Sequence, residues 1–195
     1  MYRLSATHVF NGQVLGGTPA LNITQHYAWG ELTVDGVIRS DIAGRLTDMA
    51  NGFSDTTITL LIGWHDGNLH YSLGATIYLP TGLYGTADVT VGPPPSIDDA
   101  LNFGKNRFAV DPTFAVTWFN PMTGLQINGA LGVTFSAKND ATNYQSAPEL
   151  HFEGSIIQQF ANGFALGAAG YAYTQRCQTG ILVDVHSDPP MSAEA

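Results

Sequence analysis

Hydrophobic and polar residues alternate with a period of two along most of this chain. The most regular stretch runs from 125 to 136, where Leu125, Ile127, Leu131, Val133 and Phe135 are separated by small or polar residues. Successive side chains of an extended strand point to opposite faces, so this pattern predicts a β-strand with one apolar and one polar face. Similar alternation predicts further strands within 57–64, 70–79, 107–118 and 149–160.

The segments that join these strands are alternately short and long. Short turns are expected at 65–68, 120–124 and 162–163, and long loops at 81–106 and 138–146. Outer-membrane barrels have tight turns on the periplasmic side and long loops outside, whereas a soluble sandwich has no reason to sort its loops by length. The sequence therefore predicts an antiparallel, up-and-down meander of about eight or nine strands that forms most of a transmembrane, outer-membrane type β-barrel. Whether this chain closes the barrel alone is left open.

The first quarter of the chain alternates less regularly. Leu21, Ile23 and Trp29 share one parity, whereas Leu32 and Val34 share the other, so the pattern changes at Gly30. A bulge within one strand or a tight turn would explain the change, and Asp35-Gly36 is a competing hairpin signal. We expect strands here without a defined register.

Composition supports a chain that spans a membrane by strands. Only 12% of the residues are charged, about half the usual globular share, which indicates a surface that does not face water alone. No stretch approaches the roughly 18 to 20 apolar residues of a spanning helix. The polar face is rich in small residues and almost free of lysine, which favours a crowded, wet lumen. Five aromatic residues beside the short turns predict a girdle at the membrane interface: Trp64, Trp118, Phe119, Phe160 and Phe164.

Charge and cysteine content exclude several classes of partner. Seven basic and sixteen acidic residues give a formal charge of -9, and no basic patch is present, so nucleic acid is not an expected partner. The single cysteine, Cys177, rules out an internal disulfide and a multi-cysteine metal site. The amino terminus lacks the features of a signal peptide, so we expect that the signal was removed from this sequence or that the sequence is incomplete. Residues 1–176 are assigned to the barrel and 177–195 to an irregular tail.

Five ionisable residues are candidates for a lumen site: Arg107, Asp111, Glu149, His151 and Glu153. They lie on the polar faces of two predicted strands and would act in selectivity. The favoured interpretation is that they fill the lumen and pair with charges on other strands. His65 and His70 flank a short turn, but two histidines without a third ligand do not predict a metal site. Ser155 and His151 share a face two pleats apart and are the only faint candidates for a nucleophile and base, so we expect no catalytic residues, no metal, no cofactor and no enzymatic activity.

The long loop at 81–106 contains Pro93-Pro94-Pro95 and Asp98-Asp99. It lacks the spaced oxygen ligands of a calcium motif, and we expect a mobile or pore-constricting extracellular loop. Four tyrosines near the strand ends are expected to anchor the barrel at the membrane interface, with stacking on an aromatic solute as the alternative: Tyr84, Tyr144, Tyr171 and Tyr173.

Four motifs follow one another along the chain, at 80–84, 102–106, 139–146 and 167–175. Their marking residues are Pro80, Gly82, Tyr84, Asn102, Gly104, Asn106, Thr142, Tyr144, Gly170, Tyr171 and Gln175. This ordered set resembles the outer-membrane family named for the meta-pathway of phenol degradation, best from 52 to 175. The resemblance implies a bacterial outer-membrane barrel that passes aromatic or other hydrophobic compounds, and it supplies no catalytic residues. After Gln175 the chain departs from the family pattern, which suggests truncation.

The function expected from these observations is passive uptake of small hydrophobic or aromatic molecules across the bacterial outer membrane, with membrane lipid and the solute as partners. The oligomeric state is left open. One alternative is a soluble, lipocalin-like calyx with apolar residues inside and polar residues outside. Another is a structural outer-membrane protein that transports nothing.

Overall fold

The computed structural model describes residues 1–39, 42–90 and 96–175. Pro93-Pro94-Pro95, Cys177 and the tail at 177–195 lie outside the described residues. Every described element is a β-strand. No helix in these ranges is long and apolar enough to cross a membrane.

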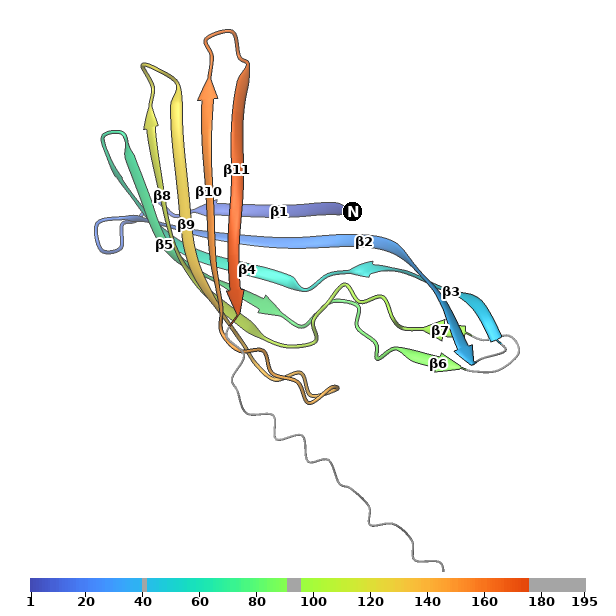
Figure 1. Cartoon of the computed structure of the whole chain (residues 1–195). Helices are drawn as coiled ribbons and strands as arrows, with labels where there is room; N and C mark the ends of the chain where they lie inside the picture. The colour runs from blue at the N-terminus through green and yellow to red at the C-terminus, as the bar shows by residue number, and fades with distance from the viewer. Residues whose placement is uncertain (40–41, 91–95, 176–195) are drawn as a thin grey trace, which may run out of the picture.

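Nine antiparallel strands form one curved sheet (Figure 1). They are β1 (Tyr2–Val9), β2 (Thr18–Arg39), β3 (Ile42–Phe53), β4 (Thr56–Asp66), β5 (Leu69–Leu79), β8 (Ala109–Asn120), β9 (Leu125–Ser136), β10 (Glu149–Gln159) and β11 (Ala165–Gln175). Two short strands, β6 (Asp88–Thr90) and β7 (Ser96–Asp98), pair separately. The main order is β1-β2-β4-β5-β8-β9-β10-β11, and β3 pairs with β2. The sheet therefore follows the chain as a meander, which confirms the predicted all-β class.

The loops lie as the sequence predicts. Short turns join β4 to β5, β8 to β9 and β10 to β11, and each contains a glycine with positive φ: Gly67, Gly124 and Gly163. Long connections join β5 to β8 and β9 to β10. These three short turns lie at one end of the sheet and these two long connections at the other (Figure 1).

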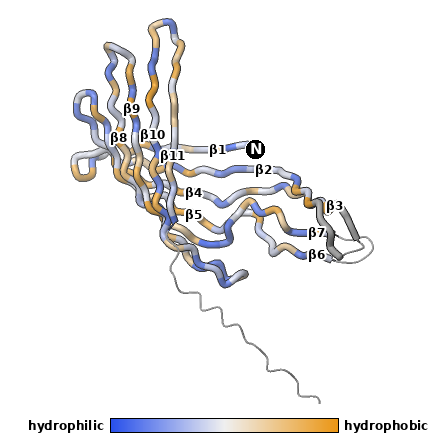
Figure 2. The backbone as a smooth tube through the Cα atoms, viewed as in Figure 1, coloured by the Kyte–Doolittle hydropathy of each residue, from blue (hydrophilic) through white to orange (hydrophobic). Residues whose placement is uncertain are grey.

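The strands keep an apolar face and a polar face in register. On the apolar face, Ile127 of β9 pairs with Trp118 of β8 and with Ile156 of β10. On the polar face, Asn128 pairs with Thr117 and Ser155. Figure 2 shows the resulting alternation of hydropathy along the strands. The sheet curls into an open half-barrel with β1 and β11 as its edges, which do not pair with each other within the described residues.

The irregular amino-terminal pattern has a different cause from the ones considered above. Strand β2 runs unbroken through Gly30, which pairs with Ala50, and through Asp35-Gly36, which pair with Arg45 and Gly44. The proposed bulge or turn at Gly30 and the hairpin at Asp35-Gly36 are therefore wrong, and the only register shift in this pair lies between Val37 and Arg39. The parity changes because the long β5–β8 loop covers the inner face of this hairpin. Val34 pairs with Leu46, which is buried there.

Contacts between the β5–β8 loop and this hairpin are both apolar and polar. Gly52 of β3 packs against the Leu83 side chain, and Gly30 faces Leu101 and Phe103. The Asp48 carboxylate accepts hydrogen bonds from the backbone N–H groups of Ala100 and Leu101 at 2.9 and 3.0 Å. A small apolar cluster therefore lies between the loop and β2–β3, and inward-facing apolar residues are favourable there.

Candidate functional site

Small polar side chains form hydrogen-bonded rows across the concave face of the half-barrel. The Asn128 side chain accepts a hydrogen bond from the Thr117 hydroxyl and donates one to the Ser155 hydroxyl, each at 2.8 Å. A second row on the same face, near the β1 edge of the sheet, joins Asn22 to the hydroxyls of Ser5 and Thr7 at 2.9 and 2.7 Å. These rows satisfy polar groups across strands, and they fit a wet lumen wall rather than an apolar core.

Four of the five predicted lumen residues form two pairs, of which one is an ion pair and the other a histidine–aspartate hydrogen bond. Arg107 and Glu149 lie 3.9 Å apart, and the side chains of both are largely buried. The His151 Nε2 lies 3.0 and 3.1 Å from the two carboxylate oxygens of Asp111. Each of the two contacts joins residues that come from different parts of the sheet. The partners lie on β10 and on β8 or two residues before it, with β9 between β8 and β10.

Gly132 of β9 makes the second pair possible. It lies between Thr113 and His151 in the cross-strand register. A Cβ at this position would collide with the His151 ring and with the Thr113 hydroxyl. The missing side chain leaves the gap through which the imidazole reaches Asp111.

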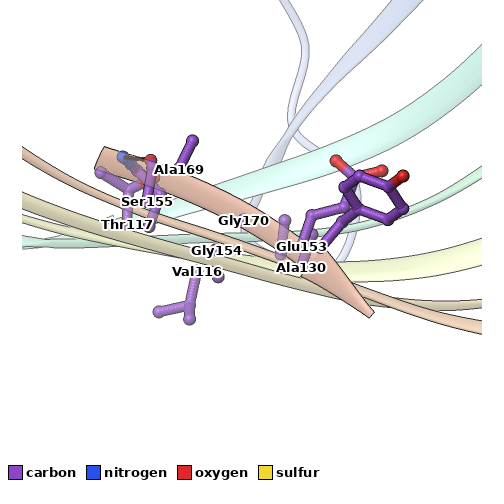
Figure 3. A pocket seen from close by; sticks show the side chains of 12 residues that line it. Val116, Thr117, Ala130, Glu153, Gly154, Ser155, Ala169 and Gly170 are labelled. Atoms are coloured by element: carbon purple, nitrogen blue, oxygen red, sulfur yellow. Dashed lines mark hydrogen bonds between the residues drawn. The ribbon is translucent and has the colours of Figure 1, made fainter. Parts of the chain in front are cut away.

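Glu153, the fifth predicted residue, stands apart from these pairs. Its cross-strand neighbours are Ala130 of β9 and Tyr171 of β11. It lines one end of a hollow of about 480 Å³, and Thr117 and Ser155 lie at the other end (Figure 3). Between them the lining is mainly alanine and glycine, so the hollow has a polar group at each end and small residues in the middle.

Asp55 holds together the outer end of the lumen. Its Oδ1 accepts a hydrogen bond from the Gly82 N–H at 3.0 Å, and its Oδ2 accepts one from the Lys105 N–H at 2.8 Å. Gly82 and Gly104 pack so closely on Asp55 and on each other that neither has room for a Cβ. The first two family motifs therefore meet at one carboxylate, which the sequence reasoning did not identify.

Asn139 joins the third motif to the same region. Its amide donates to the Tyr84 hydroxyl at 3.0 Å and to the Lys105 carbonyl at 3.1 Å, and its carbonyl oxygen accepts from the Asn106 amide at 3.3 Å. The Asn102 side chain likewise accepts from the Gly85 N–H and donates to the Gly85 carbonyl. These motif residues link the two long loops to each other.

The other motif residues have separate positions. Thr142 lies in the turn between Asn139 and Tyr144, whose backbones pair. Gly170 pairs with Gly154, and the Gln175 amide approaches the Ala147 carbonyl at 3.5 Å. A single aspartate before a threonine-rich strand carries no sequence signal that would have identified Asp55. Asn139 lay within a recognised motif, but its central role was not apparent.

The structure corrects the interpretation of several aromatic residues. Tyr171 and Tyr173 pair with Glu153 and His151, so both lie on the concave, polar face and not on the apolar face where anchors were expected. Tyr84 is held in the loop network, and the Tyr144 ring lies 6.0 Å from the Arg107 guanidinium. In the predicted girdle, Trp64 and Trp118 do lie on the apolar face, but Phe119 pairs with Gln126 on the polar face.

The two remaining candidates from the sequence have local partners. His65 and His70 pair across the β4–β5 hairpin with their Nδ1 atoms 3.0 Å apart. In the described ranges, no three histidine, cysteine or acidic side chains gather closely enough to hold a metal ion. Ser155 accepts from Asn128 and His151 contacts Asp111, so these two side chains are engaged with different partners.

Comparison with known proteins identifies the family of this chain. No curated protein and no solved structure matches the chain significantly. The family model described as "Putative MetA-pathway of phenol degradation" matches residues 2–188. The matched range includes the amino-terminal strands as well as the four motifs, and the all-β meander agrees with the barrel that the motifs imply. The chain therefore belongs to the phenol-degradation MetA-pathway family.

Proposed function

We propose that this protein is an outer-membrane channel for passive uptake of small hydrophobic or aromatic compounds. The observation that carries the proposal is the placement of its apolar side chains. Large apolar residues of the convex face are about half exposed: Leu60 51%, Leu73 56%, Leu131 51% and Phe152 50%. Contiguous exposed apolar surface of this kind needs a covering, and membrane lipid is the covering that a strand-built apolar band fits.

The concave face supports the same proposal. It carries hydroxyl, amide and ionisable groups joined in rows and pairs, which is the lining expected of a water-filled pore. A soluble calyx would place the apolar residues on the concave side, opposite to their position here. A solute would enter between the long loops, cross this wall and leave by diffusion, with no catalytic step, metal or cofactor. Pore width and lumen charge would set specificity.

In lipid, unpaired edge strands are not tolerated because their backbone groups have no water to bond. The proposal therefore requires that β1 and β11 gain partners in the membrane, from each other, from a second copy or from further strands. A closed barrel of any of these kinds would migrate differently on a gel before and after heating. Outer-membrane fractionation of the chain fused to a signal peptide, followed by this gel, tests membrane insertion and closure.

Flux measurements then separate a channel from a structural membrane protein. Liposomes containing the purified protein should admit a phenyl glucoside, an aromatic solute that crosses bare bilayers slowly. Ala130→Trp adds bulk to the lumen wall and should slow entry, whereas Ala168→Trp adds the same bulk to the apolar face and should not. Heat-modifiable protein in the outer membrane without solute entry would favour the structural role. Failure to enter the membrane would contradict the proposal itself.

A further inference from the structure

We propose that Glu153 makes this lumen select for cationic and neutral solutes and against anions such as aromatic carboxylates. This inference rests on the proposed channel function and assigns the charge class of its solutes.

Apart from Asp48 of β3, which the β5–β8 loop covers, the described concave face carries three carboxylates and two guanidinium groups. The carboxylates are Asp111, Glu149 and Glu153, and the guanidinium groups are Arg107 and, by its register with His26, Arg3. Arg107 is matched with Glu149, and Asp111 lies against His151. Arg3 lies at the outer end of β1, across the half-barrel from β10. No hydrogen bond or ion pair among the described residues engages the Glu153 carboxylate.

The cross-strand row through Glu153 contains no other charge. Following the register from β10 gives Ala130, Ala115, Ser72 and Gly63, and in the other direction it gives Tyr171. Small side chains leave the carboxylate accessible, and the hollow of about 480 Å³ lies directly against it (Figure 3). A solute that passes this level meets one negative charge, one phenol ring and otherwise small neutral groups.

An uncompensated charge in a narrow pore raises the local concentration of counterions and lowers that of ions with the same sign. Glu153 therefore attracts ammonium groups, accepts hydrogen bonds from neutral hydroxyl or amine donors, and repels carboxylates. Tyr171 adds a ring beside the carboxylate, on which a cation or an aromatic solute can lie. Nearer the loops, Asp55 and Glu149 line a small cavity together with Lys105 and Arg107, so opposite charges balance there.

The ion selectivity of the full chain in planar bilayers tests this inference. A KCl gradient should give a reversal potential of cation-selective sign. Glu153→Gln keeps the side-chain shape and should reduce the K⁺/Cl⁻ permeability ratio by about sixteenfold, because one unit charge about 5 Å away through water changes the local concentration of each ion about fourfold, in opposite directions. Glu31→Gln removes an equal charge from the exposed, outward-facing side of β2 and should leave the ratio unchanged. Conductance that favours Cl⁻, or a ratio that Glu153→Gln does not change, would overturn the inference while the channel function stands.

A second measurement does not depend on conductance. Ala130→Cys, in a chain with Cys177→Ser, places a thiol beside Glu153 on the lumen face. In detergent, we compare the rates at which a cationic and an anionic methanethiosulfonate reagent modify this thiol. The ratio of the cationic to the anionic rate should be higher with Glu153 in place than in the Glu153→Gln background. Equal rate ratios in the two backgrounds would overturn the role of Glu153. Protein that shows the expected rate ratios but conducts nothing would count against the channel function alone.

Discussion

His151 of β10 reaches across β9 to Asp111 of β8, with its Nε2 3.0 and 3.1 Å from the two carboxylate oxygens. The two residues are 40 positions apart and are not on neighbouring strands. The contact therefore connects three strands of the half-barrel through side chains, in addition to the backbone ladders. The Asp111 side chain is only 10% exposed, so the pair stabilises the wall.

Removing this contact should weaken the sheet. Asp111→Ala leaves a largely buried imidazole without its partner, and such losses cost about 1–3 kcal/mol of unfolding free energy. The measurement is urea unfolding in detergent, followed by tryptophan fluorescence. Asp66→Ala removes an exposed carboxylate at a short turn and should cost far less. An equal loss in both variants would contradict the structural role of the pair.

Gly132 should not tolerate even one added methyl group. In Gly132→Ala, the new Cβ would occupy the space that the His151 ring and the Thr113 hydroxyl now fill, so the imidazole must move away from Asp111. We expect a loss similar to that of Asp111→Ala, and the double variant should lose little more than either single variant because both break one contact. Gly170→Ala is the control, since a Cβ there meets open space. Strictly additive losses would contradict this arrangement.

Asp55 should control the β5–β8 loop rather than the sheet. Asp55→Ala removes the acceptor of the Gly82 and Lys105 N–H groups, and each hydrogen bond to a charged group contributes roughly 1.5–3 kcal/mol. We expect faster proteolytic cleavage within 80–108 while heat modifiability is kept. Asp88→Ala, an exposed change within the same loop, provides the comparison. Unchanged cleavage in Asp55→Ala would show that the apolar contacts hold the loop without it.

A lysine should destabilise the membrane-inserted protein more on the apolar face of β9 than on its polar face. Leu131→Lys places a charge on the apolar face, where such changes cost about 2–4 kcal/mol at the bilayer midplane. Asn128→Lys places the same charge on the wet face and should cost less, apart from its hydrogen bonds to Thr117 and Ser155. Recovery from outer membranes and urea midpoints in lipid give the comparison. A larger loss for Asn128→Lys would contradict the lipid-facing assignment of the convex surface.

The alternating sequence determined the strand class, the two faces and the ends at which loops lie. These properties depend on a period of two and on local turn residues such as Gly67, Gly124 and Gly163, and both can be read from short stretches of chain. The same parity placed five ionisable residues together on the polar face: Arg107, Asp111, Glu149, His151 and Glu153. The family motifs were recognisable for the same reason, because each is local.

Tertiary structure alone decided which of those residues meet. Whether His151 or Glu153 reaches Asp111 depends on the register of three strands and on the gap at Gly132, and neither is encoded in the period. The parity change at Gly30 had no local cause, since it reflects a loop some 50 to 70 residues later that packs against Gly30 and Gly52. Asp55 became central because two distant glycines pack on its carboxylate. Periodicity assigns a side chain to a face, but the partners on that face depend on how separate strands and loops come together.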